Sequence, residues 1–588
     1  MSLLGENINT LWSSLIIEEL VRQGIEYFCI SPGSRSTPLV VAAARNPRAQ
    51  VIICYDERGA AYHALGYAKG SGKPAVLICT SGTAVANYFP AVIEANLDHI
   101  PLLILSSDRP PELLETGANQ TIPQRKIFGE HLRWEFGLPC PTYDILPTFV
   151  LTTVAQAIHR CNSQPAGPVQ LNIMFREPLA PVSAPVPSDY EISLESWRTS
   201  REPFTRYSSK IMTPAENDLI RLTDILNRTS RGWLVLGRMH SLEAIIAAKK
   251  LIELLEWPVF ADINSGLRMG FDHSAMIAHF DLLLLSEQMQ KQCAPQVIVQ
   301  IGEHITSKRF LYYIQNHCPK EYIVIQNHPG RIDPAHCVSW RMECDIPGLV
   351  HHLDGKLFPR IDISWRQYLR TRSDQVDAII EKFVQSRDLK DEISIARLIS
   401  QHIPGNSGLF LGNSMPIRDM DFFADGKGPV VRLATQRGAS GIDGHIAGAI
   451  GFAAGLKKSV ILVLGDLAFL HDLNSLSLLK ECRYPVTFVL INNQGGGIFS
   501  FLQIANFNDV FERYFATPHS YTFAAAAQLF GISYRNPQSS LEFITSLKQS
   551  GESAQSSIIE VNTRRDQNKM AHDELFAKIR EFLQHDRV

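Results

Sequence analysis

The chain lacks the features that mark membrane-spanning, exported and nucleic-acid-binding proteins. No apolar run approaches the ~20 residues that a helix needs to cross a bilayer, and the N-terminal segment has no signal-peptide pattern. The formal net charge is only -3, which gives no electrostatic reason to expect nucleic acid or an anionic membrane as a partner. We therefore expect a cytoplasmic protein.

Cysteine pairs with metal-binding spacing are also missing. The chain has ten cysteines, including Cys29, Cys54, Cys79 and Cys482, but none forms a C-x-x-C pair, and most lie inside apolar runs. Such positions are typical of reduced core residues in a cytosolic protein, and they argue against a disulfide framework or a zinc site. Low-complexity tracts and short-period repeats are absent too.

The length and the composition indicate several globular domains. With 588 residues, of which 45% are apolar and 20% are charged, the chain is too long for one core but has an ordinary globular profile. Strand-like and helix-like segments alternate in three successive stretches, which predicts the α/β class with three doubly wound parallel-sheet domains. We place these domains at 1–180, 205–355 and 385–588.

Short apolar, β-branched runs mark the strands of these sheets. They predict strands at 27–31, 51–55, 75–79, 101–106 and 169–174, then at 232–236, 258–262, 297–301 and 322–326, and finally at 408–412, 459–464, 486–491 and 557–560. Helices are expected between them, for example at 10–23 and 57–69. The proline-rich stretch 178–203 predicts a linker without regular structure, and 354–363 predicts a second linker.

Two peptides of the third domain place oxygen-bearing residues directly after apolar runs. They are Ile461-Leu-Val-Leu-Gly-Asp-Leu467 and Val486-Thr-Phe-Val-Leu-Ile-Asn-Asn-Gln-Gly-Gly-Gly497, with a predicted crossover helix at 471–483 between them. A right-handed strand–helix–strand unit brings both strand ends to one edge of the sheet, where open α/β sheets bind ligands. Asp466 and Asn493 should therefore lie side by side. With a backbone carbonyl from the glycine run, they would suit Mg²⁺ that also holds a diphosphate.

Each half of this pair also has an ordinary explanation. Asp and Asn are common in turns, so either half alone would fit a core strand followed by a turn. The glycines 495–497 also resemble the phosphate loop of an NAD-binding oxidoreductase, but no G-x-G-x-x-G fingerprint follows an N-terminal strand. A non-catalytic binding protein with a decayed site is a further alternative.

Arginine-bearing loops follow strands in the first and third domains. Their sequences are SPGSRSTP at 31–38, SSDRP at 106–110, GNSMPIR at 412–418 and QRGASGIDG at 436–444. Guanidinium groups bind carboxylates in a bidentate manner. Four such loops beside strand ends therefore predict one or two substrates that carry several carboxylates.

Together these segments resemble the MenD family of thiamin diphosphate (ThDP) enzymes, the 2-succinyl-5-enolpyruvyl-6-hydroxy-3-cyclohexene-1-carboxylate (SEPHCHC) synthases of menaquinone biosynthesis. ThDP enzymes carry Gly-Asp-Gly, a spacer and Asn-Asn, and here Gly-Asp-Leu is followed by 24 residues, 468–491, before Asn-Asn. The leucine and the loops at 31–38, 412–418 and 436–444 match this family's own pattern. The resemblance spans nearly the whole chain and implies the three-domain, pyruvate decarboxylase-like fold.

The resemblance implies ThDP and Mg²⁺, or Mn²⁺ in its place, as cofactors. Asp466, the side chain of Asn493 and the carbonyl of Gly495 match the metal ligands. Glu57 matches the glutamate that promotes the imino tautomer of the aminopyrimidine, although an acid at a helix start also complements the helix dipole. Ile442 matches the apolar residue that bends the cofactor. The remaining implied cofactor contacts, some of which fit a core position equally well, are Gly465, Leu467, Ile498 and Phe499.

The implied reaction decarboxylates 2-oxoglutarate and adds the succinyl carbanion to isochorismate in a 1,4 fashion, giving SEPHCHC and CO₂. Another ThDP-dependent 2-oxoacid decarboxylase or carboligase is the alternative with the same fold. The residues that match the substrate-binding set are Ser34, Arg35, Arg109, Asn119, Gln120, Lys308, Arg309, Ser414, Arg418 and Arg437.

The resemblance also implies an assembly. ThDP enzymes place the glutamate domain and the metal domain of one active site on different subunits. We therefore expect a homo-oligomer, either a dimer or a dimer of dimers, with active sites at subunit interfaces.

Overall fold

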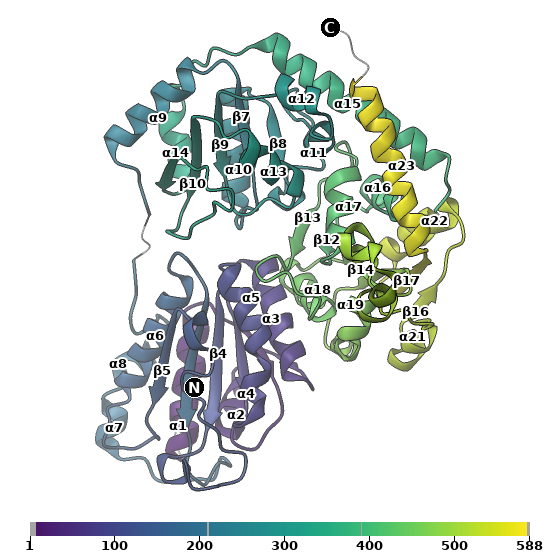
Figure 1. The fold of residues 1–588 in the computed structure, drawn as a ribbon. Coiled ribbons are helices and arrows are strands. Elements are labelled where there is room, and N and C mark those ends of the chain that lie inside the picture. Colours follow the sequence, from purple (N-terminus) through teal and green to yellow (C-terminus); the bar gives the residue numbers. More distant parts are fainter. Residues whose placement is uncertain (1–6, 209–210, 390, 585–588) are drawn as a thin grey trace. The chain divides into compact units, whose positions relative to one another are not determined.

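Three parallel sheets with covering helices make up the protein (Figure 1). The computed structural model describes residues 7–208, 211–389 and 391–584. These residues form two compact units. The first comes from 7–208, 436–460 and 470–485, and the second from 211–389, 391–435, 461–469 and 486–584. The predicted α/β class with three parallel sheets is confirmed, while the domain limits at 180, 205, 355 and 385 stay predictions.

The first unit is built on a six-stranded parallel sheet in the order β2-β1-β3-β4-β6-β5. Every residue of the central strands β3 and β4 is buried, as expected for parallel strands that are covered on both faces. The strands are β1 (Tyr27–Ile30), β2 (Gln50–Ile53), β3 (Ala75–Cys79), β4 (Leu102–Asp108), β5 (Trp134–Leu138) and β6 (Pro168–Met174). The helices are α1 (Ile8–Arg22), α2 (Thr37–Arg45), α3 (Glu57–Ser71), α4 (Thr83–Asn87), α5 (Phe89–Leu97) and α6 (Thr148–Asn162).

The prediction that 178–203 has no regular structure is wrong. This stretch contains two short helices, α7 (Ser188–Ile192) and α8 (Glu195–Thr199). Trp197 donates from its indole N–H to Glu19 at 2.9 Å, and Trp12 donates to the hydroxyl of Tyr190 at 2.6 Å. These aromatic anchors are buried against α1, so tertiary packing overrides the local effect of the prolines.

Helix α18 (His445–Leu456) packs against α3 inside the first unit. The two helices approach closely because glycines face each other along the contact. A Cβ atom on Gly66 would collide with the carbonyl oxygen of Gly448, and one on Gly451 would collide with the carbonyl oxygen of His63. Small residues at these positions let the two backbones pack directly on each other.

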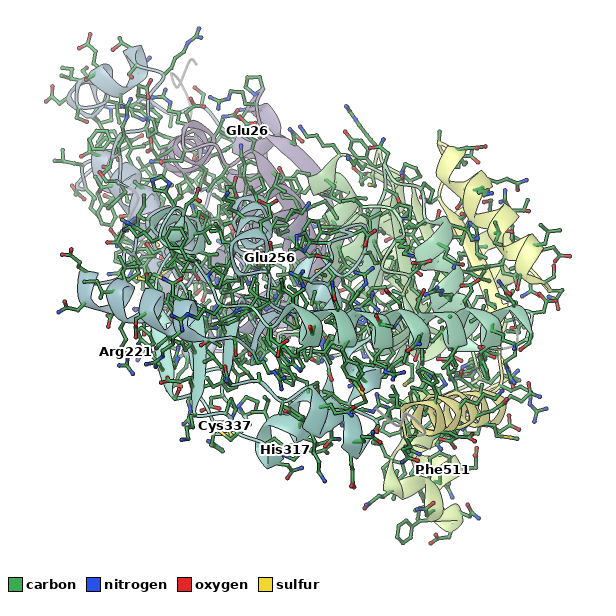
Figure 2. The ribbon with its side chains drawn as sticks, turned by 90° about the horizontal axis from the view of Figure 1, so that it is seen from above. Glu26, Arg221, Glu256, His317, Cys337 and Phe511 are labelled. Atoms are coloured by element: carbon green, nitrogen blue, oxygen red, sulfur yellow. The ribbon has the colours of Figure 1, made fainter. Side chains whose placement is uncertain are left out.

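The middle sheet belongs to the second unit and has five parallel strands in the order β11-β10-β9-β7-β8. Arg221 stacks over Trp340 at 4.7 Å, and Arg366 donates to Glu256 at 2.6 Å at the end of α10. Figure 2 labels Arg221 and Glu256 among the side chains. The strands are β7 (Gly232–Leu236), β8 (Val259–Ala261), β9 (Val297–Ile301), β10 (Glu321–Gln326) and β11 (Trp340–Glu343). The helices are α9 (Glu216–Arg228), α10 (Leu242–Leu255), α11 (Phe280–Leu283), α12 (Glu287–Gln292), α13 (Lys308–Asn316), α14 (Ile346–Leu353) and α15 (Ile363–Gln385).

The third sheet repeats the plan of the first, with six strands in the order β13-β12-β14-β15-β17-β16. The strands are β12 (Gly408–Leu411), β13 (Arg432–Thr435), β14 (Val460–Gly465), β15 (Val486–Asn492), β16 (Ser533–Arg535) and β17 (Ser557–Asn562). The helices are α16 (Glu392–His402), α17 (Met415–Phe423), α19 (Asp466–His471), α20 (Asn508–Phe511), α21 (Ala524–Phe530), α22 (Ser540–Glu552) and α23 (Arg565–Gln584). Between β14 and β15 the predicted single helix is instead α19 followed by a 3₁₀ helix, η4 (Leu473–Lys480).

A charge network around the buried Arg397 ties α15 to α16 within the second unit. Arg397 donates to Asp377 at 2.7 Å and to Glu381 at 3.0 Å, and His279 lies 2.9 Å from the same Asp377 carboxylate. These partners hold the pKa of Asp377 below its usual range even though burial raises it. Breaking one member would leave an uncompensated buried charge.

The thirteen predicted strands all appear, each within two residues of its predicted ends. Within the described residues, four further strands were not predicted from the sequence, namely β5, β11, β13 and β16, and each lies at an edge of its sheet. Among the helices of the described residues, none combines the length and the apolar character that a bilayer crossing requires.

Candidate functional site

Asp466 and the Asn493 turn meet at the carboxyl ends of two neighbouring strands of the second unit. Asp466 directly follows β14 and begins α19, while Asn493 directly follows β15. One carboxylate oxygen of Asp466 accepts from the N–H of Leu467 at 2.6 Å, and the other accepts from the N–H of Gly495 at 3.0 Å. The structure therefore brings together the residues that the sequence paired, although Asp466 and Asn493 are 27 positions apart.

The amide of Asn493 is turned so that its oxygen has no protein partner. Its Nδ2 donates to Oε1 of Glu392 at 2.9 Å, and its Oδ1 is buried and accepts no hydrogen bond from the residues that the structure describes. An unsatisfied buried acceptor is costly. A hard cation would satisfy it, because amide and carboxylate oxygens are the ligands that Mg²⁺ takes in proteins. The donor set therefore fits a divalent metal.

Several acidic groups lie around this amide, and burial affects their pKa. It raises the pKa of Asp466, and the N–H of Gly495 and His519 only partly oppose that shift. Burial, together with the charge of Asp419, raises the pKa of Glu392 to about 8. Carboxyl groups crowded in a dry site resist ionisation, so a cation that neutralises them would bind favourably here.

The glycine turn after Asn493 is shaped for close backbone approach. Gly495 has φ near +145°, and a Cβ atom there would collide with the carbonyl oxygen of Ala516. Gly497 opens a 3₁₀ helix, η5 (Gly497–Phe501), that carries the half-buried Ile498 and Phe499. Gly465 and Leu467 flank Asp466 and are half-buried. The predicted cofactor contacts of the second unit thus lie around the carboxyl ends of β14 and β15.

Two residues of this site, Glu392 and His519, escaped the sequence analysis. Glu392 begins α16, 101 positions before Asn493. The Nε2 atom of His519 lies 3.3 Å from the Asp466 carboxylate, and its side chain is 8% exposed. The TPH segment that carries His519 follows no apolar run, and Glu392 looks like an ordinary acid in a first helical turn, so no local pattern singled them out.

Ser414 and Arg418 lie at the start of α17. Ser414 has φ near +73°, a left-handed conformation that is uncommon for a residue with a side chain. The guanidinium of Arg418 donates to the carbonyl oxygen of Ser414. The GNSMPIR loop is thus fixed at the end of β12, with both predicted substrate residues on one turn.

The predicted basic pair of the middle sheet separates into two different environments. Lys308 is exposed at the first position of α13. Arg309 forms an ion pair with Asp281, and its guanidinium lies 4.5 Å from the ring centre of Phe576. Arg309 therefore has a packing role of its own, and substrate binding by either residue stays a prediction.

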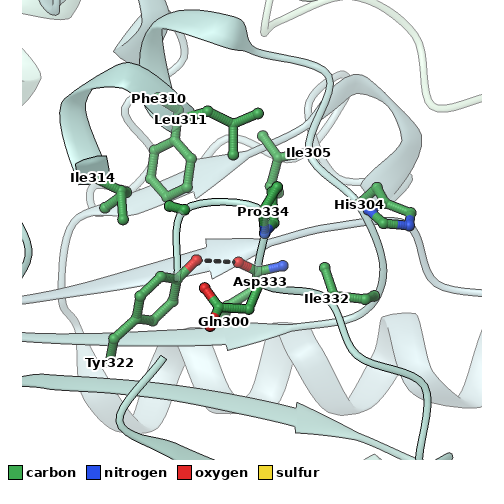
Figure 3. A pocket seen from close by; sticks show the side chains of 11 residues that line it. Gln300, His304, Ile305, Phe310, Leu311, Ile314, Tyr322, Ile332, Asp333 and Pro334 are labelled. Carbon is green, nitrogen blue, oxygen red and sulfur yellow. Dashed lines mark hydrogen bonds between the residues drawn. The ribbon is translucent and has the colours of Figure 1, made fainter. Parts of the chain in front are cut away.

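A small cavity also lies in the middle sheet, beside the predicted basic pair. It measures about 50 Å³, and the Tyr322 hydroxyl donates to Gln300 at 2.6 Å along one wall while Ile305 and Phe310 close another (Figure 3). That volume holds at most a few water molecules. The cavity is therefore too small for a substrate with several carboxylates.

In the first unit Glu57 begins α3 directly after the second strand. Asp56 caps this helix by accepting from the N–H of Arg58 at 2.8 Å, which leaves Glu57 half-buried on the first turn. Burial raises the pKa of Cys79 to about 12, and the nearby charge of Glu57 adds to that shift. The predicted activating carboxyl thus stands beside the end of β3.

Arg35 and Arg109 form a pair of like charges in the first unit. Burial, and next the charge of Arg109, lower the pKa of Arg35, which is 5% exposed. Arg35 donates to the carbonyl of Phe175 at 2.9 Å and lies 3.4 Å from Glu177. The Nε atoms of both arginines are buried without a hydrogen-bond partner among the described residues. A carboxylate ligand would satisfy these donors and relieve the repulsion.

The remaining predicted substrate residues of the first unit lie in the loop at 31–38 and in a second loop, Thr116-Gly-Ala-Asn-Gln120, and they are exposed. Gly33 lets the first loop press against Thr80, because a Cβ atom at Gly33 would collide with that side chain. Gln120 has φ near +58° and donates to the carbonyl of Ser81 at 2.9 Å. The other two exposed residues are Ser34 and Asn119. Both loops thus reach the end of β3.

The loop that carries Arg437 and Ile442 is clamped inside the first unit. Both carboxylate oxygens of Glu94 accept backbone N–H groups, from Gly438 at 2.9 Å and from Ala439 at 2.6 Å. Ile442 remains 38% exposed, and Arg437 is half-buried. A rigid loop that presents an exposed isoleucine fits the predicted cofactor prop.

Comparisons with known proteins agree with this geometry. Residues 12–127 match the N-terminal binding domain of thiamine pyrophosphate enzymes, residues 188–411 match a middle domain of thiamine pyrophosphate enzymes, and residues 431–561 match the C-terminal binding domain. The chain is 45% identical to the SEPHCHC synthase of Chlorobium phaeobacteroides, covering 98% of this chain and 99% of the relative. It is 43% identical to the same synthase of Rubrobacter xylanophilus, over 96% and 98%, and 40% identical to that of Salinibacter ruber, over 97% of each.

The three matched domains follow one another in the order of the three sheets, so the predicted ThDP-enzyme fold is confirmed. The matched C-terminal binding domain covers Asp466 and the Asn493 turn. At this identity over nearly its whole length, the chain belongs to the family of ThDP-dependent 2-succinyl-5-enolpyruvyl-6-hydroxy-3-cyclohexene-1-carboxylate synthases.

Proposed function

We propose that this chain is a SEPHCHC synthase of menaquinone biosynthesis that converts 2-oxoglutarate and isochorismate into SEPHCHC and CO₂. The observation that carries the proposal is the buried, unpartnered Oδ1 of Asn493 beside Asp466 and Gly495, in a chain whose full-length relatives are synthases of this name. A site of this kind has a clear use in a ThDP enzyme, where a metal must hold the cofactor's diphosphate.

The metal would be held by Asp466, by Oδ1 of Asn493 and by the carbonyl of Gly495. Mg²⁺ suits these oxygen ligands, and Mn²⁺ would fit in its place. When bound, ThDP supplies the nucleophilic carbon that attacks the 2-oxoacid and accepts the electron pair released with CO₂. The exposed Ile442 would support the cofactor, with Ile498 and Phe499 as apolar walls.

The carboxyl group of Glu57 would hold a proton at N1′ of the aminopyrimidine. Its place on the first turn of α3 suits this task, since Asp56 fixes the turn by capping it. A half-buried carboxyl can exchange a proton with a ring nitrogen while its position is kept by the helix.

The unpartnered donors of Arg35 and Arg109 support binding of substrate carboxylates. Removing water from such a site strengthens the attraction between guanidinium and carboxylate groups. It also shields a developing carbanion from protonation by solvent. The other predicted substrate residues, which would orient the two acids, are Ser34, Asn119, Gln120, Lys308, Arg309, Ser414, Arg418 and Arg437.

We further propose a cytoplasmic homo-oligomer, either a dimer or a dimer of dimers, with domains at 1–180, 205–355 and 385–588. Sedimentation of the purified protein would test the assembly. A species at the monomer mass of 65.8 kDa, active at the same protein concentration, would contradict it.

A two-substrate assay tests the reaction. We expect SEPHCHC only when 2-oxoglutarate, isochorismate, ThDP and Mg²⁺ are all present. Release of free succinic semialdehyde as the main product, with and without isochorismate, would instead favour a simple ThDP-dependent 2-oxoacid decarboxylase.

A further inference from the structure

The metal site depends on which end of the Asn493 amide faces the cation. The acceptor oxygen and the donor nitrogen of an asparagine amide have nearly the same size, so a half-turn of the amide exchanges their positions. If the amide rotated by half a turn, its N–H groups would point at the cation and repel it. Something in the protein must therefore select one of the two orientations.

Glu392 makes that selection in the structure. Its Oε1 accepts from Nδ2 of Asn493 at 2.9 Å, and Glu392 is only 2% exposed. A carboxylate can only accept hydrogen bonds, and a neighbouring cation favours this ionised form of Glu392. The ionised group accepts the amide N–H, whereas the flipped amide would present an oxygen to an oxygen. The contact thus favours the orientation in which Oδ1 points away from Glu392 and stays free of protein donors.

The backbone that carries Glu392 is fixed at the start of α16. The N–H of Glu392 donates to the side chain of Asn568 on α23 at 3.0 Å. The preceding residue, Asp391, caps α16 by accepting from Ser394 at 2.9 Å. Gly497 leaves room for the amide, since a Cβ atom there would lie 2.6 Å from Nδ2 of Asn493.

We propose that Glu392 is a positioning residue that takes the amide N–H of Asn493 and thereby aims Oδ1 at the divalent cation. The inference rests on the proposed metal site and deepens it. Partners of metal ligands commonly fix ligand orientation, and their loss typically costs about 10- to 100-fold in metal affinity.

A purely structural role is the competing explanation, because a buried acid with a satisfied hydrogen bond also contributes to folding. The chain offers a matched control one residue away. Nδ2 of Asn492 donates to Oε1 of Glu560 at 2.7 Å, and both residues are buried. This is the same chemical pair on the same strand end, but Asn492 is not among the predicted metal ligands.

The experiment measures metal affinity directly. Free Mn²⁺ is titrated by electron paramagnetic resonance with full-length protein at saturating ThDP, for wild type, Glu392→Met and Glu560→Met. Thermal unfolding without ligand reports stability in parallel. We expect Glu392→Met to weaken Mn²⁺ binding about 10- to 100-fold, and Glu560→Met to lower the unfolding temperature while its Mn²⁺ affinity stays within about 3-fold of wild type.

A double-mutant cycle gives a second readout that a structural role would not move. Asn493→Asp offers an acceptor oxygen in either orientation, so in that background Glu392→Met should weaken Mn²⁺ binding much less than in the wild type. Equal losses in both backgrounds would overturn the positioning role, because independent effects add.

The remaining outcomes are also decisive. Unchanged Mn²⁺ affinity in Glu392→Met overturns the inference while leaving the synthase proposal intact, whereas a wild type that takes up no Mn²⁺ with ThDP contradicts the proposed metal site itself.

If the Met variants do not fold, Glu392→Gln and Glu560→Gln replace them. A neutral amide is a weaker and less selective acceptor, so Glu392→Gln should lose about 3-fold or more, and a loss equal to that of Glu560→Gln overturns the role.

Discussion

The first and third sheets have the same strand order but opposite chemistry at their carboxyl ends. Counted within each sheet, both run second, first, third, fourth, sixth, fifth. In the third sheet the third and fourth strands, β14 and β15, lead into Asp466 and Asn493. In the first sheet the equivalent strands, β3 and β4, lead into Thr80 and Arg109.

This difference teaches how one architecture serves two ligands. Buried carboxyl and amide oxygens collect at the end of the third sheet. The first sheet instead brings two arginines together, beside the buried Asp108 that ends β4. The backbone plan sets where strand ends lie, and the few residues after each strand decide whether that place attracts a cation or an anion.

Removing the acid of the third sheet should have the largest effect. We expect Asp466→Ala to lower Mg²⁺-dependent ThDP affinity by at least about 100-fold, since even the partners of metal ligands contribute 10- to 100-fold, and to abolish product formation. Calorimetric titration with ThDP, with and without Mg²⁺, measures this loss. The equivalent change in the first sheet, Thr80→Ala, is the control and should bind ThDP and Mg²⁺ like wild type. Equal behaviour of the two variants would remove the contrast between the sheets.

Glu57→Gln should separate activation from binding. The amide keeps the size of the side chain but cannot exchange a proton with the ring nitrogen, so we expect kcat to fall by about 10²- to 10⁴-fold while ThDP affinity changes little. Exchange of the C2 proton of bound ThDP, followed by NMR, reports the step directly. A wild-type exchange rate would take Glu57 out of its role.

The anion site of the first sheet should respond through substrate binding alone. Arg109→Met removes one charged hydrogen-bond donor, which is worth about 1.5–3 kcal/mol, so KM for one of the two substrates should rise roughly 10- to 100-fold. ThDP and Mg²⁺ affinities should not change. Arg160→Met, on the exposed surface of α6, is the control. A drop in ThDP affinity without a change in either KM would contradict the assignment.

The smallest predicted effect concerns a buried histidine that the first unit keeps neutral. Burial lowers the pKa of His63 to about 4, and the ring lies 2.8 Å from the hydroxyl of Tyr27. The unfolded chain binds a proton near pH 6.5, so this group stabilises the fold above that pH and its contribution is lost as the pH falls toward 4. Between pH 7 and 5.5 the loss should be about 1 kcal/mol.

Denaturant unfolding of wild type and His63→Gln at both pH values measures that loss. The stability difference between the two proteins should shrink by about 1 kcal/mol on acidification. A difference that is independent of pH would show that His63 is not the titrating group. His572 provides a contrast in the second unit, because the Asp419 carboxylate raises its pKa against the effect of burial, so its contribution is present at low pH and is lost as the pH rises.

The strands could be predicted from the sequence where they form apolar runs, as the inner strands do and as the exposed edge strand β2 (Gln50–Ile53) also does. Inner strands such as β3, β9 and β15 are continuous apolar runs because helices cover both of their faces. The missed strands β5, β11, β13 and β16 are edge strands with partly exposed residues, so their composition is mixed and no run marks them. The linker prediction at 178–203 is wrong for a different reason. Tyr190 and Trp197 pack against α1, which is far away in the sequence, and no local pattern indicates that contact.

The amino-acid sequence by itself determined the sheets and the cofactor class. The sequence shows these features because they are local patterns, formed by residues that follow one another in the chain. They are the apolar runs, the Gly-Asp-Leu and Asn-Asn pair and the arginine loops. Only the tertiary structure decided how the Asn493 amide is turned, that Asp466 receives the N–H of Gly495, and that Arg309 is bound by Asp281. Those outcomes depend on contacts between residues tens of positions apart, and hydrogen-bond direction at such contacts is set by folding and leaves no periodic signal in the chain.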